Sequence, residues 1–509
     1  MRNSICLIVA FIVATTIGCT STPGVQIAPR GETPQVTYVT SVKIGGEGAA
    51  EIVAYSPITK SLYVVNNSED SRVDQVDVQD LNNPRVSGSI DITQYGGGVN
   101  SVAVYENYLA MAVEADDKQS PGSIVIYDIR TLEKIAVVPA GALPDMVTFS
   151  PDGRFVLSAN EGEPNNEYTN DPEGSVTIVS TANWEATQVG FTAFSTNLTE
   201  QEAQGLRVFG PGASFAQDLE PEYIAVRDDS KVAYVVFQEN NAFGIIDLET
   251  KTATAIHPFG FKDHSLAQNT FDPSDRDGRV QFGNWAVKGM YLPDAIDVVT
   301  INGVSYLFTA NEGDSRDYDG FSEETRVKDL DLDEEAFPQA SLLQADESLG
   351  RLKTTTTLGD TDGDGKFEEI YAYGGRSFSI WNADTGEQIY DSGDFIGRKI
   401  YEIAPSVFNL DDDTPDGRSD DKGTEPEAIT LGLHRGHLLA FVGLERTSGL
   451  MVFDVSNPIR PDFSQWLYRS EDISPEGLYF VPAEKSHTGQ ALLFAGYEVS
   501  GTVGIFTVE

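Results

Sequence analysis

The sequence predicts an all-β protein and, within this class, a β-propeller. Short apolar runs rich in Val, Ile, Phe and Tyr are bounded by Gly, Pro, Asn or Asp, which is typical of strands and turns. These runs recur in groups of up to four, at intervals of roughly 40 to 75 residues, which is typical of propeller blades. No long segment follows the helical period. A two-sheet sandwich is the alternative fold, but it gives no reason for such regular units.

The first strand of each expected unit begins with an acidic residue, usually after Pro. The clear copies are PDMVTFS at 144–150, PEYIAV at 221–226, PDAIDVV at 293–299, PEAITL at 426–431 and PEGLYFV at 475–481. With weaker copies, the count is eight four-stranded units, which start near residues 50, 99, 143, 219, 292, 352, 425 and 474. The sixth unit is weak at its first strand, so seven blades is the alternative count.

The two ends of the chain predict how the ring closes. The chain stops after TVGIFTVE at 502–509, which is a third strand, and VTYVTSVKIGG at 36–46 has the pattern of a fourth. The N-terminal strand is therefore expected to complete the last blade and leave no open edge. Residues 36–509 are predicted to form a single propeller domain.

The N-terminus predicts export. One Arg precedes an apolar stretch that is too short to span a membrane, and Ile-Gly-Cys follows. We interpret residues 1–18 as a lipoprotein signal peptide, Cys19 as the lipidated residue and 19–35 as a flexible tether; plain secretion is the alternative. The expected location is the cell envelope, with the lipid in the outer membrane and the propeller facing the periplasm or the surface. Because Cys6 leaves with the signal, the mature chain has no pair of cysteines for a disulfide.

The charge balance limits the partners. The chain has 79 acidic and 34 basic residues and a net charge of −45, which disfavours nucleic acid as a partner. Such a surface attracts divalent cations, although solubility alone would also explain the excess. Five His residues, none with ligand spacing, argue against zinc. We expect a monomer.

Acidic residues are expected to gather at one mouth of the propeller channel. The start of the first strand and the end of the second strand of each blade lie on the same face, and acidic residues occupy both places. The set comprises Asp145, Glu161, Glu222, Glu239, Asp294, Glu312, Glu427, Glu445, Glu476 and Glu498. Carboxylates held together repel unless cations bridge them, and Ca²⁺ suits oxygen ligands. The alternative is that these residues only form turns.

A second metal site is predicted in DTDGDGKFE at 360–368. Asp360, Asp362, Asp364 and Glu368 offer oxygens at intervals around Gly365, as in a calcium-binding loop. We expect a structural Ca²⁺ hairpin between the first two strands of a blade, away from the channel mouth. A solvated Asp-Gly turn is the alternative.

Three arginines are candidate catalytic residues. Arg316, Arg376 and Arg446 each follow an expected second strand, on the face of the carboxylates. An Arg beside a metal–carboxylate centre can hold phosphate oxygens in the transition state. The alternative is that each is a counter-ion for neighbouring carboxylates.

These segments together resemble the choice-of-anchor I family. The matching stretches include PDMVTFSPDGRFVLSANEGEPN, ANEGDSRDY, GGRSFSIW, RSDDKGTEPE and EVSGTVGIF, in order along residues 38–509. The resemblance implies an exported, propeller-like protein, and some members carry labels such as alkaline phosphatase or cell-surface glycoprotein. The architecture is also similar to that of secreted propeller phosphatases with several metals in an acidic channel, although the mature chain lacks the Cys ligand of one such class.

The first functional hypothesis is a lipid-anchored, Ca²⁺-dependent phosphoesterase that acts on a phosphorylated small molecule. The channel carboxylates would hold the metals, and the arginines would offset the charge of the transition state. The alternative is a non-catalytic, Ca²⁺-stabilised propeller that binds a surface ligand or mediates adhesion. A scaffold in cell-envelope assembly is a third option.

Overall fold

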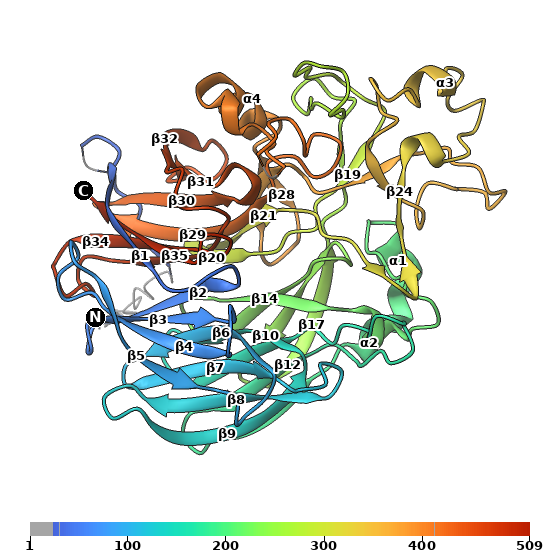
Figure 1. Cartoon of the computed structure of the whole chain (residues 1–509). Coiled ribbons are helices and arrows are strands. Elements are labelled where there is room, and N and C mark those ends of the chain that lie inside the picture. The colour runs from blue at the N-terminus through green and yellow to red at the C-terminus, as the bar shows by residue number, and fades with distance from the viewer. Residues whose placement is uncertain (1–23, 30, 412) are drawn as a thin grey trace, which may run out of the picture.

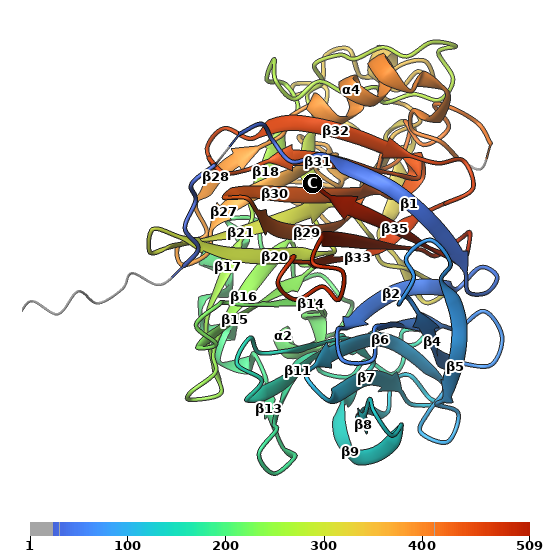
Figure 2. The ribbon, with the colours of Figure 1, turned by 90° about the vertical axis from the view of Figure 1, so that its left-hand side faces the viewer.

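The computed structural model describes residues 24–29, 31–411 and 413–509, so the expected signal peptide and Cys19 lie outside the described residues. The described chain is dominated by seven four-stranded antiparallel sheets arranged around an axis (Figures 1 and 2). Each of the first six sheets follows the chain from its innermost strand outward. In the described residues no helix is long and apolar enough to cross a membrane. The arrangement of the sheets confirms the predicted all-β propeller.

The first four blades cover the N-terminal half of the chain. Their strands are β2 (Ala49–Ser56), β3 (Ser61–Asn66), β4 (Arg72–Asp77), β5 (Arg85–Asp91); β6 (Gly98–Tyr105), β7 (Tyr108–Glu114), β8 (Pro121–Asp128), β9 (Glu133–Ala142); β10 (Pro144–Phe149), β11 (Phe155–Asn160), β12 (Ser175–Ser180), β13 (Glu185–Val189); and β14 (Pro221–Val226), β15 (Val232–Phe237), β16 (Ala242–Asp247), β17 (Thr252–Pro258).

The last three blades include one with a long interruption and one that uses the N-terminal strand. Their strands are β20 (Ile296–Ile301), β21 (Val304–Asn311), β27 (Ser377–Asn382), β28 (Gln388–Asp391); β29 (Pro426–His434), β30 (His437–Leu444), β31 (Gly449–Asp454), β32 (Asp462–Tyr468); and β33 (Pro475–Val481), β34 (Ala491–Tyr497), β35 (Thr502–Val508), β1 (Val36–Lys43).

In the described residues the ring has seven blades, which is the alternative number that the sequence predicted. The innermost strands β2, β6, β10, β14, β20, β29 and β33 each contact the next, and β33 contacts β2. The unit expected near residue 352 does not enter this ring. Its strands β27 and β28 complete the blade begun by β20, and the other sheets in the described residues are one of three strands and two of two strands, all outside the ring. A long insertion between β21 and β27 made one blade look like two.

The N-terminal strand closes the ring as predicted. β1 pairs with β35 in antiparallel register, from Val36 opposite Val508 to Lys43 opposite Thr502. Val42 packs in the core between the last and first blades, with Val503 and Ile505. The segment expected as a tether also lies against the propeller in its described part. The Val25 amide donates to the Thr300 carbonyl at 2.8 Å and the Ala28 amide to the Gly436 carbonyl at 3.1 Å.

Insertions from blades 4 to 6 form a cap on one face of the ring. They connect second to third strands or fourth to first strands, so they lie on the same face, and Figure 1 shows α3, β24 and α4 gathered on one side. A separate apolar cluster that includes Phe271, Val327 and Leu352 gives the cap its own core. Its elements are β18 (Phe261–Asp263), β19 (Lys288–Met290), β22 (Asp317–Tyr318), β23 (Phe321–Ser322), β24 (Glu324–Arg326), β25 (Lys353–Thr355), β26 (Tyr371–Tyr373), α3 (Ala340–Leu343), α4 (Phe395–Ile403), η2 (Val327–Asp329) and η3 (Pro405–Val407).

Short helices also lie elsewhere. η1 (Thr192–Asn197), α1 (Leu198–Glu202) and α2 (Phe215–Asp218) connect blades 3 and 4, and η4 (Glu445–Thr447) follows β30.

Closure by β1 predicts that Val42→Asp destabilises the whole propeller. Val42 is 8% exposed in the apolar cluster between two blades, so an unpaired carboxylate there should lower the free energy of unfolding by more than about 2 kcal/mol. Thermal unfolding measures the effect. Thr37→Asp on the exposed side of the same strand is the matched control, and equal loss in both variants would contradict the prediction.

Candidate functional site

The innermost strand of each blade brings one polar side chain to the same position at the channel mouth. In every blade this residue lies two positions before the first apolar residue that packs into the blade. The seven residues are Glu51, Asn100, Asp145, Glu222, Asp294, Glu427 and Glu476. Six are carboxylates and one is an amide, so the ring repeats the same chemistry around the axis.

A break in strand pairing aims these side chains into the channel. The pairing between the first and second strands shifts around this position in six blades, for example between Pro144 and Val147 and between Pro475 and Leu478. In the remaining blade Asp294 lies two residues before the first residue of β20. Such bulges re-aim a side chain at a functional position. In four blades the Pro-acid motif of the sequence therefore marks such a bulge.

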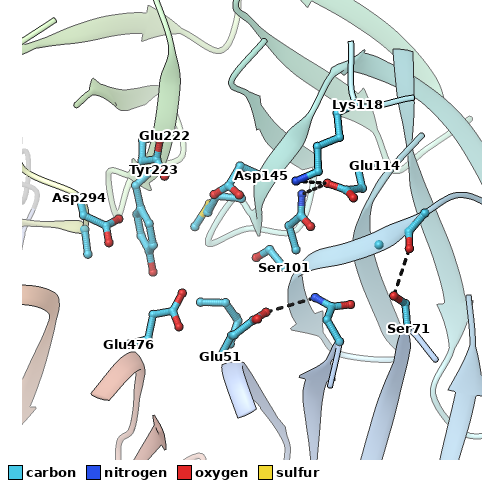
Figure 3. Close-up of a pocket in the computed structure, with 17 residues that line it drawn as sticks. Glu51, Ser71, Ser101, Glu114, Lys118, Asp145, Glu222, Tyr223, Asp294 and Glu476 are labelled. Atoms are coloured by element: carbon cyan, nitrogen blue, oxygen red, sulfur yellow. Dashed lines mark hydrogen bonds and ion pairs between the residues drawn. The ribbon is translucent and has the colours of Figure 1, made fainter. Parts of the chain in front are cut away.

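Six of the seven residues line one central cavity of about 460 Å³; Glu427 lies outside this lining. Figure 3 shows Glu51, Asp145, Asp294 and Glu476 directed toward a shared space, with Tyr223 between the last two. The described residues that line it include a single ammonium group, that of Lys118, which lies 3.5 Å from Glu114. The cavity is thus a strongly acidic space with one cation at its side.

The ends of the second strands approach the same region. Carboxylate oxygens of Asp294, Glu312 and Glu427 lie within 4.8 Å of one another, and those of Glu312, Glu425 and Glu445 form a second such group. The structure therefore brings together the predicted starts and ends of strands in blades 5 and 6. Glu161 and Glu239 are 9% and 6% exposed at equivalent positions of blades 3 and 4, and Glu498 follows β34.

The Asn and the Glu of the repeated Ala-Asn-Glu-Gly have different roles. The Asn160 amide donates to Thr177 at 2.9 Å, and the Asn311 amide donates to Ser379 at 2.8 Å, each across to the third strand. Both asparagines are fully buried. The Asn therefore fixes the end of the strand, while the following Glu161 or Glu312 extends toward the carboxylate ring.

Burial and mutual repulsion raise the pKa values of these carboxyls. Burial is the largest cause for Glu51, whose pKa is raised to about 8, with Glu498 adding to it. For the same reasons the pKa of Asp145 is raised to about 7 and that of Glu445 to about 8. The pKa values of Glu222, Asp294, Glu427 and Glu476 are raised well above their usual range. Such a ring holds protons or cations at neutral pH.

Glu425 is the exception because three cations surround it. Arg418 lies 2.7 Å from it, Arg446 lies 3.2 Å away and Lys422 lies 3.7 Å away. Although burial raises the pKa of Glu425, these cations outweigh burial and lower it to about 2. This carboxylate is therefore ionised and already paired.

Two of the three predicted catalytic arginines are committed to buried contacts. Arg316 is 1% exposed and bonds to Asp218 and Glu220. Arg376 donates to the carbonyls of Asp272 at 3.2 Å, Ser419 at 2.9 Å and Asp421. Arg446 pairs with Glu425 and Glu445, and its side chain is 36% exposed. For Arg316 and Arg446 the structure matches the counter-ion alternative, and Arg376 anchors a loop of the cap.

The calcium-type loop lies in the cap and not in the turn between the first two strands of a blade, where the sequence had placed it. It connects β25 to β26, because the expected sixth blade does not exist as a separate sheet. Oxygens of Asp360, Asp362 and Glu368 lie within 4.8 Å of one another. Asp364 is outside this group and accepts from the Lys366 amide at 2.9 Å.

Sequence reasoning missed several residues of this site. Glu51 and Asn100 lie in the weaker copies of the repeat, and Glu114 ends the second strand of blade 2. Aligning every copy on its first packed apolar residue would have found the first two. Lys422 lies in the SDDKGTEPE stretch, whose pairing with Glu312 depends on how the insertion folds.

Comparisons with known proteins match the chain to a family and to curated relatives. A family model described as the choice-of-anchor I domain matches residues 51–458. Gigasin-3a of Magallana gigas is 30% identical over 191 residues, which cover 33% of this chain and 67% of that protein. The mesenchyme-specific cell surface glycoprotein of Strongylocentrotus purpuratus is 28% identical over 379 residues, 65% of this chain and 46% of that protein. The chain thus matches less than half the length of the second relative.

Solved structures give a distant likeness. Hydrazine synthase of Kuenenia stuttgartiensis is 13% identical with a TM-score of 0.48, over 91% of this chain and 96% of that one. The β-propeller domain of Cps50 (Swd1) from Myceliophteria thermophila is 9% identical with a TM-score of 0.46, over 93% and 100% of the two chains. Neither likeness bears on function.

The raised pKa values predict how the stability of the protein depends on pH when EDTA removes divalent cations. The folded state holds protons on these carboxyls above the pKa of the unfolded chain, so stability should fall as pH rises from about 4.5 to about 8. Glu51→Gln removes this group. The free energy of unfolding of the variant minus that of the wild type should therefore be larger at pH 8 than at pH 5, by on the order of 1–3 kcal/mol. Thermal unfolding at both pH values tests this. Glu471→Gln at an exposed position is the control, and an equal gain at both pH values would refute it.

Proposed function

Because the chain belongs to the choice-of-anchor I family, we propose that it is a cell-surface propeller that binds divalent cations, Ca²⁺ first, in its central cavity. Membership of this family indicates an exported or cell-surface protein. The finer proposal is a lipoprotein anchored through Cys19 to the outer membrane. A relative whose name places it at the cell surface supports this location.

One observation carries the proposal: five carboxylates of the seven-residue ring line one cavity with a single ammonium group beside them. They are Glu51, Asp145, Glu222, Asp294 and Glu476, and the ammonium is that of Lys118. Like charges this close are stable only with protons or cations between them. Bound cations would remove the repulsion at neutral pH without protonation.

The donor set fits a hard cation. The ring offers carboxylate and amide oxygens, the ligands that Ca²⁺ prefers, and no described His or Cys lines the cavity. Glu427, whose carboxylate lies in one group with that of the cavity residue Asp294, has a buried Oε2 without a hydrogen-bond partner among the described residues. Orphaned carboxylate oxygens are costly, and a cation would satisfy them.

Phosphomonoester hydrolysis is the second candidate function, and the size of the cavity favours it. A volume of about 460 Å³ exceeds what ions alone need and is in the range of small-molecule sites. Bound divalent cations would supply positive charge for phosphate oxygens and acidify water. In this scheme the ring carboxylates position the cations, and Lys118 offers a further positive charge to the phosphate at the cavity wall. A non-catalytic propeller that binds a phosphorylated surface ligand would use the same contacts.

Removing ring ligands should reduce calcium binding. The double variant Asp294→Asn/Glu476→Gln removes two carboxylates from the lining of the cavity, so Ca²⁺ affinity should fall at least about tenfold, as it does when outer partners of metal ligands are lost. Calorimetric titration and metal analysis measure this. Asp360→Asn/Asp362→Asn removes ligands of the loop in the cap, so that calcium binding there can be distinguished from binding at the ring. Glu402→Gln at an exposed position is the matched control. Unchanged affinity in the ring variant would contradict a central site.

Phosphatase activity should depend on the ring and on divalent cations. Purified protein is expected to hydrolyse a chromogenic aryl phosphate, to lose activity in EDTA and to recover it with Ca²⁺. Asp294→Asn/Glu476→Gln should lower the rate at least about tenfold, while Asp360→Asn/Asp362→Asn should leave it unchanged. No turnover with Ca²⁺, Mg²⁺, Mn²⁺ or Zn²⁺ would reject catalysis and leave the binding function.

A further inference from the structure

Lys422 occupies the position of a cation between blades 5 and 6. Its ammonium lies 2.6 Å from Glu312, 3.3 Å from Asp314 and 3.7 Å from Glu425. Glu312 and Glu425 belong, with Glu445, to a group of carboxylates whose oxygens lie within 4.8 Å of one another. The side chain of Lys422 is 11% exposed. The ammonium therefore pairs with two members of this three-carboxylate group and is largely shielded from solvent.

The loop that carries Lys422 is held in place from both sides. The Gly423 amide donates to the Arg418 carbonyl at 3.0 Å, and the Lys353 amide donates to the Asp420 carbonyl at 2.9 Å. Arg376 donates to the carbonyls of Ser419 and Asp421 on the same loop. The fixed carbonyls before Lys422 and the fixed Gly423 amide after it make the position of Lys422 part of the fold.

This sector of the ring supplies its own cations. Lys422, Arg418 and Arg446 lie 2.6 to 3.7 Å from Glu312, Glu425 and Glu445, and two further carboxylates join them, Asp314 at 3.3 Å from Lys422 and Asp421 at 3.1 Å from Arg418. Both oxygens of Glu312 are engaged, since Gln238 donates to the second at 2.8 Å. Of the described residues that line the cavity on the other side, five are carboxylates of the ring and Lys118 alone carries a positive charge.

We propose that Lys422 is a built-in counter-ion that takes the place of a divalent cation between Glu312, Glu425 and Glu445. Its ammonium and a Ca²⁺ ion would need the same oxygens, because Ca²⁺ binds oxygen at 2.3–2.6 Å. The ring therefore binds divalent cations only in the open cavity, and Glu312 is withheld as a ligand. This number and placement of ions rest on the proposed cation-binding function, whereas the role of Lys422 is tested independently of it.

Lys422→Met is the central experiment. It removes the charge and keeps a long side chain, so three carboxylates are left with two arginines. The variant is expected to bind one more Ca²⁺ per chain than the wild type, counted by metal analysis after dialysis and by calorimetric titration with CaCl₂. The double variant Lys422→Met/Glu312→Gln should lose this additional ion, because it removes one of its ligands.

Lys353→Met is the matched control. Lys353 lies 2.9 Å from Glu324 and 3.1 Å from Asp421, so it also bridges two carboxylates, but these are not part of a three-carboxylate group. Its loss is expected to leave the ion count at the wild-type value. An additional ion in this control would show that any lost lysine frees a calcium site and would overturn the special role of Lys422.

The outcomes separate this inference from the proposed function. An equal ion count in wild type and Lys422→Met overturns the inference, even where the wild type binds Ca²⁺ in the cavity. One ion in Lys422→Met and none in the wild type supports the inference and rejects the proposed function. If Lys422→Met is unfolded in EDTA, recovery of the folded state in Ca²⁺ supports the inference. Failure to recover, while Lys422→Met/Glu312→Gln folds, overturns it.

Discussion

Repulsion among carboxylates at the propeller axis is the constraint on which the rest of the site depends. Six of the seven blades place an acidic side chain at the same point of their first strand. Concentrating like charges in a buried space is unfavourable unless each is neutralised. The fold must therefore supply protons, internal cations or bound ions, and the structure shows an internal cation in one sector and a cavity in the others.

The backbone holds this unfavourable arrangement by repetition. A shift in strand pairing turns the acidic side chain inward, and buried asparagines such as Asn160 and Asn311 tie the neighbouring second strand to the third. Because β1 closes the last blade, no blade can move outward to relieve the repulsion. The carboxylates stay together since the ring is closed, and the cost is met by the apolar cores between blades.

The repeat made most of the fold predictable, but not the contacts between insertions and ring. The pattern of apolar runs and turn residues predicted most of the blades, the closing strand and the carboxylates of the Pro-acid motif, because all of these follow from local sequence. Periodicity failed where residues 312–376 separate β21 from β27, which made one blade look like two. The buried partners of Arg316 and Lys422 depend on how the cap folds over the ring, and local pattern does not encode that.

The insertions break the symmetry of the ring. They come from blades 4 to 6 and contribute Arg316, Arg418 and Lys422, whereas the blades with short loops contribute only Lys118 to the channel mouth. Cations of the protein itself thus pair with the carboxylates under the cap, and the carboxylates on the open side face a cavity. A symmetric ring of ions would satisfy every blade equally, but an asymmetric one leaves a space where cations and a ligand can meet. The cap therefore determines which part of a repeated structure can act as a site.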